Sequence, residues 1–183
     1  MRVDFGRLIK SILPLAILAV PLTAWGEASF IGVDTATQGT WNGKYGGDGF
    51  MLANGPSQQP AYGSASVSGA STFTWAGLTS DVRALQSGPG LTTRKAALYY
   101  ASTFTINVSV NDGNLHPVAL YMLDWDKVSL AQTVTVYDAA TSAVLDTQNI
   151  SNFSSGKYYS WNVRGSVRIT VAATGYGNAA VSG

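Results

Sequence analysis

The stretch from residue 116 to residue 126, HPVALYMLDWD, constrains the fold more strongly than any other part of the chain. Both alternating faces of residues 118–123 are apolar, so a strand here must be covered on both sides. We therefore expect it in the centre of a sheet, with the alternating segment 132–137 antiparallel beside it. One face would carry Val118, Leu120 and Met122, and the other Ala119, Tyr121 and Leu123.

Short alternating runs continue through the chain after residue 26, and none has the periodicity of an amphipathic helix. Turn-forming residues separate about ten such runs at intervals of about 8–12 residues, which is typical of an all-β, antiparallel β-sandwich. We expect a jelly roll, with an immunoglobulin-type topology as the second choice. The turns at residues 111–114 and 164–165 each predict a β-hairpin.

The first 26 residues have the composition of a secretory signal peptide. A basic start is followed by an apolar run over residues 12–22 and by small residues just before Glu27. The run is short for a membrane span, which needs about 20 apolar residues. We expect a signal peptide over residues 1–26, or an uncleaved N-terminal anchor as the one membrane contact. A single domain over residues 27–183 would then be secreted, extracellular or periplasmic.

The charge balance excludes several classes of partner. Residues 1–26 hold three of the 11 Lys and Arg residues and one of the 10 Asp and Glu residues, which leaves eight against nine for the domain. Nucleic-acid binding requires a concentrated basic face, so no nucleic-acid partner is expected. The chain has no cysteine, which excludes disulfides, thiol catalysis and thiolate metal sites.

Several loop residues suit the recognition of carbohydrate. Sugar rings present apolar C–H faces surrounded by hydroxyl groups, so their sites combine exposed aromatic rings with carboxylate, amide or guanidinium groups. Loops at one end of a sandwich can bring these groups together. The candidate ligand-binding residues are Trp41, Asn42, Tyr45, Asp48, Arg83, Arg94, Asp124, Trp125 and Asp126. Trp75 and Trp161 lie within alternating segments and are expected in the core.

A structural calcium ion is a second possibility for the aspartates. Ca²⁺ takes six to eight oxygen ligands, often with backbone carbonyls of glycine-rich loops. The candidate ligands are Asp34, Asp48, Asp124 and Asp126, although no linear D-x-D-x-D-G loop is present. An alternative role for Asp124 or Asp126 is an ion pair with Arg83 or Arg94 that joins two loops.

Catalysis is not expected from these residues. Glu27 is the sole glutamate, so a Glu-based glycosidase pair is not available, and no motif locates an Asp–Asp pair. His116, the sole histidine, precedes Pro117 at the start of a strand and is expected in a turn. The metalloprotease, serine-hydrolase and phosphate-loop motifs are all missing.

Five segments resemble a repeat domain of large secreted bacterial proteins with the galactose-binding-like jelly-roll architecture of many carbohydrate-binding modules. They are residues 32–50 (GVDTATQGTWNGKYGGDGF), 121–126 (YMLDWD), 136–147 (VYDAATSAVLDT), 153–171 (FSSGKYYSWNVRGSVRITV) and 178–183 (NAAVSG). The resemblance covers nearly all of residues 30–183. It implies a short aromatic strand after the Val-Ser-Gly segment, and the chain as given ends at Gly183.

Three functions compete, and each predicts a different surface. A non-catalytic module for polysaccharide or cell-surface glycan, which we favour, predicts Trp41 and Trp125 exposed together on one loop face. A structural or adhesive domain of an envelope or matrix predicts both indoles buried and an exposed edge strand. A hydrolase predicts two aspartates facing each other at about 5–10 Å.

Overall fold

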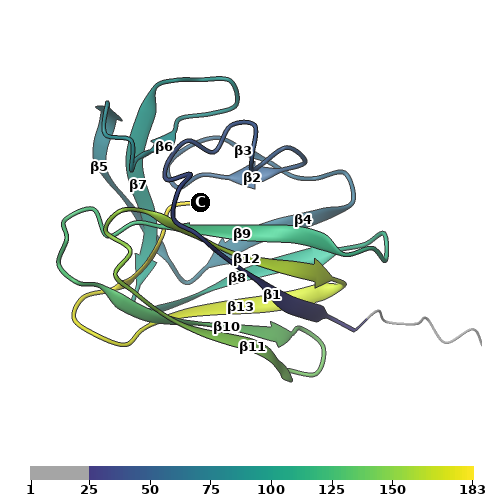
Figure 1. Cartoon of the computed structure of the whole chain (residues 1–183). Helices are drawn as coiled ribbons and strands as arrows, with labels where there is room; N and C mark the ends of the chain where they lie inside the picture. Colours follow the sequence, from purple (N-terminus) through teal and green to yellow (C-terminus); the bar gives the residue numbers. More distant parts are fainter. Residues whose placement is uncertain (1–24) are drawn as a thin grey trace, which may run out of the picture.

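The computed structural model describes residues 25–183, so the predicted signal peptide lies almost entirely outside the described residues. Among residues 25–183 no helix has the length and apolar character of a membrane span. The described chain is built from strands (Figure 1). They are β1 (Glu27–Asp34), β2 (Phe50–Met51), β3 (Ser57–Gln58), β4 (Gly63–Ser68), β5 (Ser71–Thr79), β6 (Leu85–Gln86), β7 (Arg94–Ala101), β8 (Thr103–Val110), β9 (His116–Met122), β10 (Ala131–Asp138), β11 (Val144–Ser151), β12 (Lys157–Arg164), β13 (Ser166–Ala173) and β14 (Ala179–Val181).

Two antiparallel sheets face each other and enclose the main core. A three-stranded sheet has the order β1-β12-β9, and a five-stranded sheet has the order β11-β10-β13-β8-β4. The alternate side chains of each sheet that face inward are apolar, which is the pattern expected for sheets in face-to-face contact. The centre of this core includes Trp161 and Val163 from one sheet and Val134, Ile169 and Val171 from the other. The all-β prediction is thus confirmed.

A third sheet completes the architecture. It has the order β14-β7-β5, with β6 on β7, and lies at the upper left in Figure 1, while β2 and β3 form a separate two-stranded ribbon. The buried side chain of Gln132 in β10 ties β14 to the core, because its amide both donates to the Ala180 carbonyl (3.1 Å) and accepts from the Ala180 N–H (2.7 Å).

The predicted faces of β9 are correct, but its predicted position in the sheet is wrong. Leu120 and Met122 belong to the core between the sheets, whereas Tyr121 and Leu123 belong to a second apolar cluster that includes Trp41. However, β9 is an edge strand of its sheet. The loop that carries Trp41 covers the outer face of β9. Both faces of β9 are therefore covered although the strand lies at the edge of its sheet.

The neighbours predicted from chain order are also partly wrong. β10 pairs with β11 and β13 rather than with β9, and the segments at 111–114 and 164–165 join strands of opposite sheets instead of forming hairpins. Alternation specifies which face of a strand is buried, but it does not specify the neighbouring strand. The turn at residues 138–142, in contrast, does join the antiparallel pair β10 and β11.

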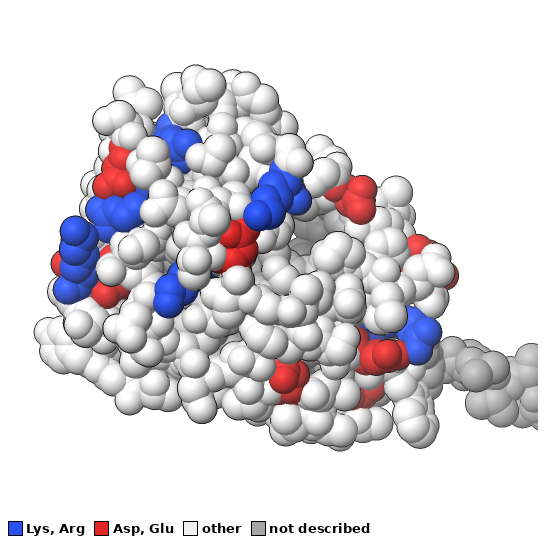
Figure 2. Space-filling model, viewed as in Figure 1, with Lys and Arg blue, Asp and Glu red and all other residues white. Residues whose placement is uncertain are grey.

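Charged side chains are sparse and mixed in sign over the surface seen in Figure 2. Lys and Arg lie among Asp and Glu, without a large area of either charge. This distribution agrees with the small net charge of the chain.

Candidate functional site

Trp41 is buried, with 4% of its surface exposed, so the expectation of an exposed ring is wrong. Its indole nitrogen donates to the Gln86 carbonyl at 2.8 Å, and its ring packs against Phe50. The surrounding chain folds back over the ring, and Gly46 approaches it so closely that a β-carbon there would lie 2.6 Å from a ring carbon. Trp41 therefore holds the loop onto the outer face of β9.

Trp125 is half-buried and lies between two other side chains. The Arg83 guanidinium stacks on its ring at 4.7 Å from the centroid, and the ring of Trp75 lies 6.4 Å away at a small interplanar angle. Trp125 and Trp41 therefore differ in burial: Trp125 is half-buried at the border of the apolar cluster, and Trp41 is buried within it.

The polar side chains that were predicted to bind a ligand mainly hold loops in place. The amide of Asn42 donates to the carbonyls of Gly88 and Leu91, and its oxygen accepts from the Gly90 N–H. Arg94 donates to two carbonyl groups and to the Thr40 hydroxyl.

Arg83 forms an ion pair with Asp81 at 2.7 Å. It also donates to the backbone carbonyl of Ser154 at 3.0 Å. The predicted pairing of Arg83 or Arg94 with Asp124 or Asp126 is therefore wrong, because a nearer carboxylate takes the guanidinium of Arg83 and backbone oxygens take that of Arg94.

Asp34 is held as a carboxylate by several donors. It accepts from the Lys44 ammonium at 2.6 Å and from the Tyr45 hydroxyl at 2.9 Å, as well as from residues 36 and 37. Burial alone would raise the pKa of Asp34, but hydrogen bonds from Lys44 and Thr37 outweigh it and hold the pKa well below its ordinary value. Burial and the adjacent carboxylate raise the pKa of Tyr45 to about 12.

The other three predicted aspartates have separate partners. Asp124 is buried and accepts from the backbone N–H groups of residues 128, 129 and 130, so it shapes the turn after β9. Asp48 accepts from the Tyr62 hydroxyl at 3.0 Å, and Asp126 accepts from the Trp75 indole at 2.8 Å. Over residues 25–183 no three acidic or histidine side chains gather in a way that could hold a metal ion.

An open groove lies beside Asp126 and is lined by aromatic side chains. Its volume is about 200 Å³. The lining residues, which we call the aromatic groove, are Phe73, Trp75, Leu98, Tyr100, Asp124, Asp126, Val128, Leu130 and Asn178. Phe73 is 50% exposed, and its ring meets Trp75 edge-on at 6.1 Å. Asp126 and Asn178 are exposed and supply polar groups at its border.

Strand pairing explains why these aromatic side chains share one surface. Ser71 of β5 lies opposite Tyr100 of β7, and Phe73 lies opposite Leu98. Residues two apart on a strand face the same side, so Phe73, Leu98 and Tyr100 lie on one face of the sheet. The sequence prediction placed Trp75 in the core and did not single out Phe73. The signal that could have found them is the spacing of two aromatics on one face of a strand rich in Ser and Thr.

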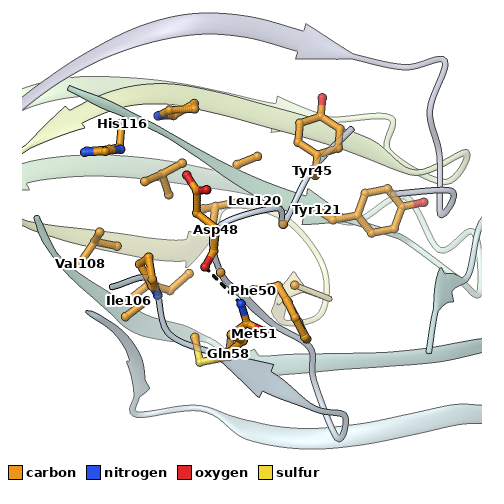
Figure 3. Close-up of a pocket in the computed structure, with 18 of the residues that line it drawn as sticks. Tyr45, Asp48, Phe50, Met51, Gln58, Ile106, Val108, His116, Leu120 and Tyr121 are labelled. Atoms are coloured by element: carbon orange, nitrogen blue, oxygen red, sulfur yellow. Dashed lines mark hydrogen bonds between the residues drawn. The ribbon is translucent and has the colours of Figure 1, made fainter. Parts of the chain in front are cut away.

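A larger cavity, which we call the edge cavity, lies between β9, β4, β8 and the β2–β3 ribbon (Figure 3). Its volume is about 440 Å³, and the surface in Figure 2 is hollowed beside β9. Ile106 and Val108 line one side, while His116 and Tyr121 lie toward opposite ends. Gln58 donates to the Asp48 carbonyl at 3.4 Å on the ribbon side.

His116 is the first residue of β9, so the predicted strand start is correct, but the residue lies in the strand and not in the turn that was expected. Its ring stacks on Tyr62 with 3.6 Å between centroids, and its Nε2 lies 2.9 Å from Asp112. These contacts join the 111–114 turn to the residue that precedes β4. Among its described contacts, His116 forms no hydrogen bond to a hydroxyl group.

Comparison with known proteins finds no matching family model, no similar curated protein and no similar solved structure.

Proposed function

We propose that the domain is an exported, non-catalytic module that binds carbohydrate, with the aromatic groove as its site. The observation that carries the proposal is the combination of three aromatic rings with polar groups at one open groove. The rings are those of Phe73, Trp75 and Tyr100, and the polar groups are the Asp126 carboxylate and the Asn178 amide. Rings of this kind suit the apolar faces of sugars, while the polar border suits their hydroxyl groups. Polysaccharide or cell-surface glycan is the proposed partner.

The arrangement of the strands supports a galactose-binding-like jelly roll as the fold within this proposal. The two facing sheets are joined by links from β8 to β9 and from β12 to β13, each of which crosses from one sheet to the other. Links of this kind exclude a simple meander and are shared by double-sheet jelly rolls and other Greek-key sandwiches. Fold alone does not identify a ligand, so the functional proposal stands on the groove.

The test is a titration of residues 27–183 with a panel of soluble polysaccharides, with and without Ca²⁺, followed by tryptophan fluorescence. Trp75 lines the groove and Trp125 adjoins it, so we expect a saturable change in emission. Phe73→Ala should weaken binding about fivefold, because aromatic stacking is worth about 1 kcal/mol. The matched control is Leu78→Ala, which changes an exposed side chain on the same strand outside the groove.

A structural or adhesive domain is the second candidate, because Trp41 is buried as that function predicts. Its observable consequence is association between copies of the chain without any glycan. An unchanged emission spectrum across the panel, together with concentration-dependent self-association in sedimentation, would replace the carbohydrate proposal with this one.

A further inference from the structure

The charged side chains that line the aromatic groove are both acidic. Asp124 and Asp126 are among its lining residues, and within residues 25–183 no Lys or Arg lines it. The groove therefore presents a negative potential beside its aromatic rings. Such a surface attracts a ligand that carries positive charge, and it repels one that carries carboxylate or sulfate groups.

The two carboxylates differ in what they can still bind. Asp124 is buried, and its oxygens accept from the backbone N–H groups of residues 128, 129 and 130. It adds negative charge to the groove but has its acceptors occupied. Asp126 is exposed, and its described hydrogen bond uses Oδ2 to accept from the Trp75 indole. Its Oδ1 is therefore the anionic acceptor that a ligand in the groove can reach.

The nearest basic side chains compensate a different carboxylate. Arg83 pairs with Asp81 at 2.7 Å and stacks on Trp125. Lys127 follows Asp126 in the chain, but no ion pair joins the two within the part of the chain that the structure describes. The pKa of Asp81 is lowered, first by the hydrogen bond from Arg83 and further by the charge of Lys127. These cations therefore leave the charge of Asp126 without an internal partner.

The aromatic rings beside Asp126 also favour a cation. Phe73 and Trp75 meet at an interplanar angle of 88° and form a corner of the groove. The faces of aromatic rings are negative, so a cation close to them is attracted, most strongly by tryptophan. Because Trp75 is hydrogen-bonded to Asp126, a cation at this carboxylate lies next to the indole.

An amino sugar with a free ammonium group matches this combination. Its ring offers an apolar C–H face to the aromatic corner, and its ammonium group is a compact cation with three donors. N-acetylation keeps the ring but removes the charge. A uronic acid instead places a second carboxylate beside Asp126, and like charges at such a distance repel.

We propose that the aromatic groove selects polysaccharides of amino sugars with free ammonium groups. This inference rests on the proposed carbohydrate-binding function and narrows it to one class of glycan. The sugar ring packs against Phe73 and Trp75, and its ammonium group donates to Oδ1 of Asp126. Neutral and acidic polysaccharides bind more weakly.

The probes are two short oligosaccharides of β-linked glucosamine, equal in length, one with free amino groups and one fully N-acetylated. Isothermal titration calorimetry at mildly acidic pH keeps the amino groups protonated. We expect the amino form to bind about tenfold more tightly, because the ion pair and the cation–π contact each contribute a few-fold. Raising the ionic strength to about 1 M should reduce this preference, since the screening length falls to about 3 Å.

Variants locate the origin of the preference. Asp126→Asn should lower it from about tenfold to about twofold, because the ion pair is lost while the aromatic contacts remain. The matched control is Asp48→Asn, the same change at an exposed aspartate that lines the edge cavity and not the groove. Phe73→Ala should weaken both oligosaccharides, since both carry the ring that stacks.

Four results would overturn the inference. Equal or tighter binding of the N-acetylated form would leave the carbohydrate function in place without selection for charge. Binding of neither oligosaccharide would exclude this class of glycan, and the polysaccharide panel then decides the carbohydrate function separately. Loss of the preference in Asp48→Asn and not in Asp126→Asn would move the site to the edge cavity. Equally tight binding of a short oligolysine would replace the sugar with a basic peptide.

Discussion

The indole nitrogen of Trp75 donates a hydrogen bond to the Asp126 carboxylate at 2.8 Å. This bond connects β5 to the loop that follows β9 and fixes one wall of the aromatic groove to its polar border. It uses Oδ2 of Asp126, and no other described side chain binds this carboxylate. The other oxygen therefore remains available to accept a hydrogen bond from a ligand of the proposed site.

Asp126→Asn should weaken glycan binding while the domain remains folded. The amide oxygen can still accept from Trp75, but hydrogen bonds to a charged carboxylate are stronger than those to a neutral amide by about 1 kcal/mol. We expect a loss of about fivefold in affinity by isothermal titration calorimetry. An unchanged affinity would remove Asp126 from the site, and urea unfolding of the variant serves as the control for the fold.

Trp41→Phe should reduce the free energy of unfolding without changing glycan affinity. The substitution leaves the buried Gln86 carbonyl without its donor, which costs about 1–3 kcal/mol. Urea unfolding and a glycan titration measure the two effects separately. If Trp41→Phe instead lost glycan affinity and kept wild-type stability, Trp41 would belong to the binding site.

Gly156→Ala should destabilise the domain more than Gly43→Ala. Both glycines have positive φ, at 82° and 81°, so each substitution carries a similar backbone strain of about 1–3 kcal/mol. A methyl group at Gly156 would also lie 1.8 Å from the Tyr121 hydroxyl oxygen, whereas nothing lies within 4 Å at Gly43. Tyr121 is buried and donates to the Arg83 carbonyl, so its ring cannot move aside freely. Similar unfolding midpoints for the two variants would contradict this expectation.

Acid should remove a contribution to stability that Asp34 makes at neutral pH. Its folded pKa is below the ordinary value of 3.8, so the unfolded chain takes up the proton first as the pH falls. The contribution is fully present above that ordinary pKa and is lost as the pH falls through the lowered folded pKa. Unfolding free energies of wild type and Asp34→Asn should therefore differ less at pH 2 than at pH 6. The same difference in unfolding free energy at both pH values would show that protonation of Asp34 does not change the stability of the domain.

The sequence predicted the strands and their buried faces because both follow from alternation within a short segment. Trp161 is fully buried, as predicted, and the two faces of β9 carry the predicted side chains. Neighbouring strands could not be predicted in the same way, since pairing joins segments far apart in the chain. The neighbours of β9 and β10 were therefore assigned wrongly.

The candidate site was harder to predict because exposure of an aromatic ring depends on what folds over it. Trp41 lies in a glycine-rich loop that looks exposed in the sequence, yet that loop closes over its own indole. Trp75 lies in an alternating strand that looks buried, yet it borders an open groove. Asp124 was a candidate for ligand or metal, but its carboxylate caps backbone N–H groups of the next turn.

The pairing of β1 with β12 determines when this fold can be completed. The pair brings Glu27 beside Arg164, 137 residues later in the chain. Contacts between such distant segments form slowly, because the entropy of closing the intervening loop is lost before the contact is gained. During synthesis β1 emerges first but can pair with β12 only after most of the domain has been translated. The three-stranded sheet is therefore completed near the end of translation of the domain.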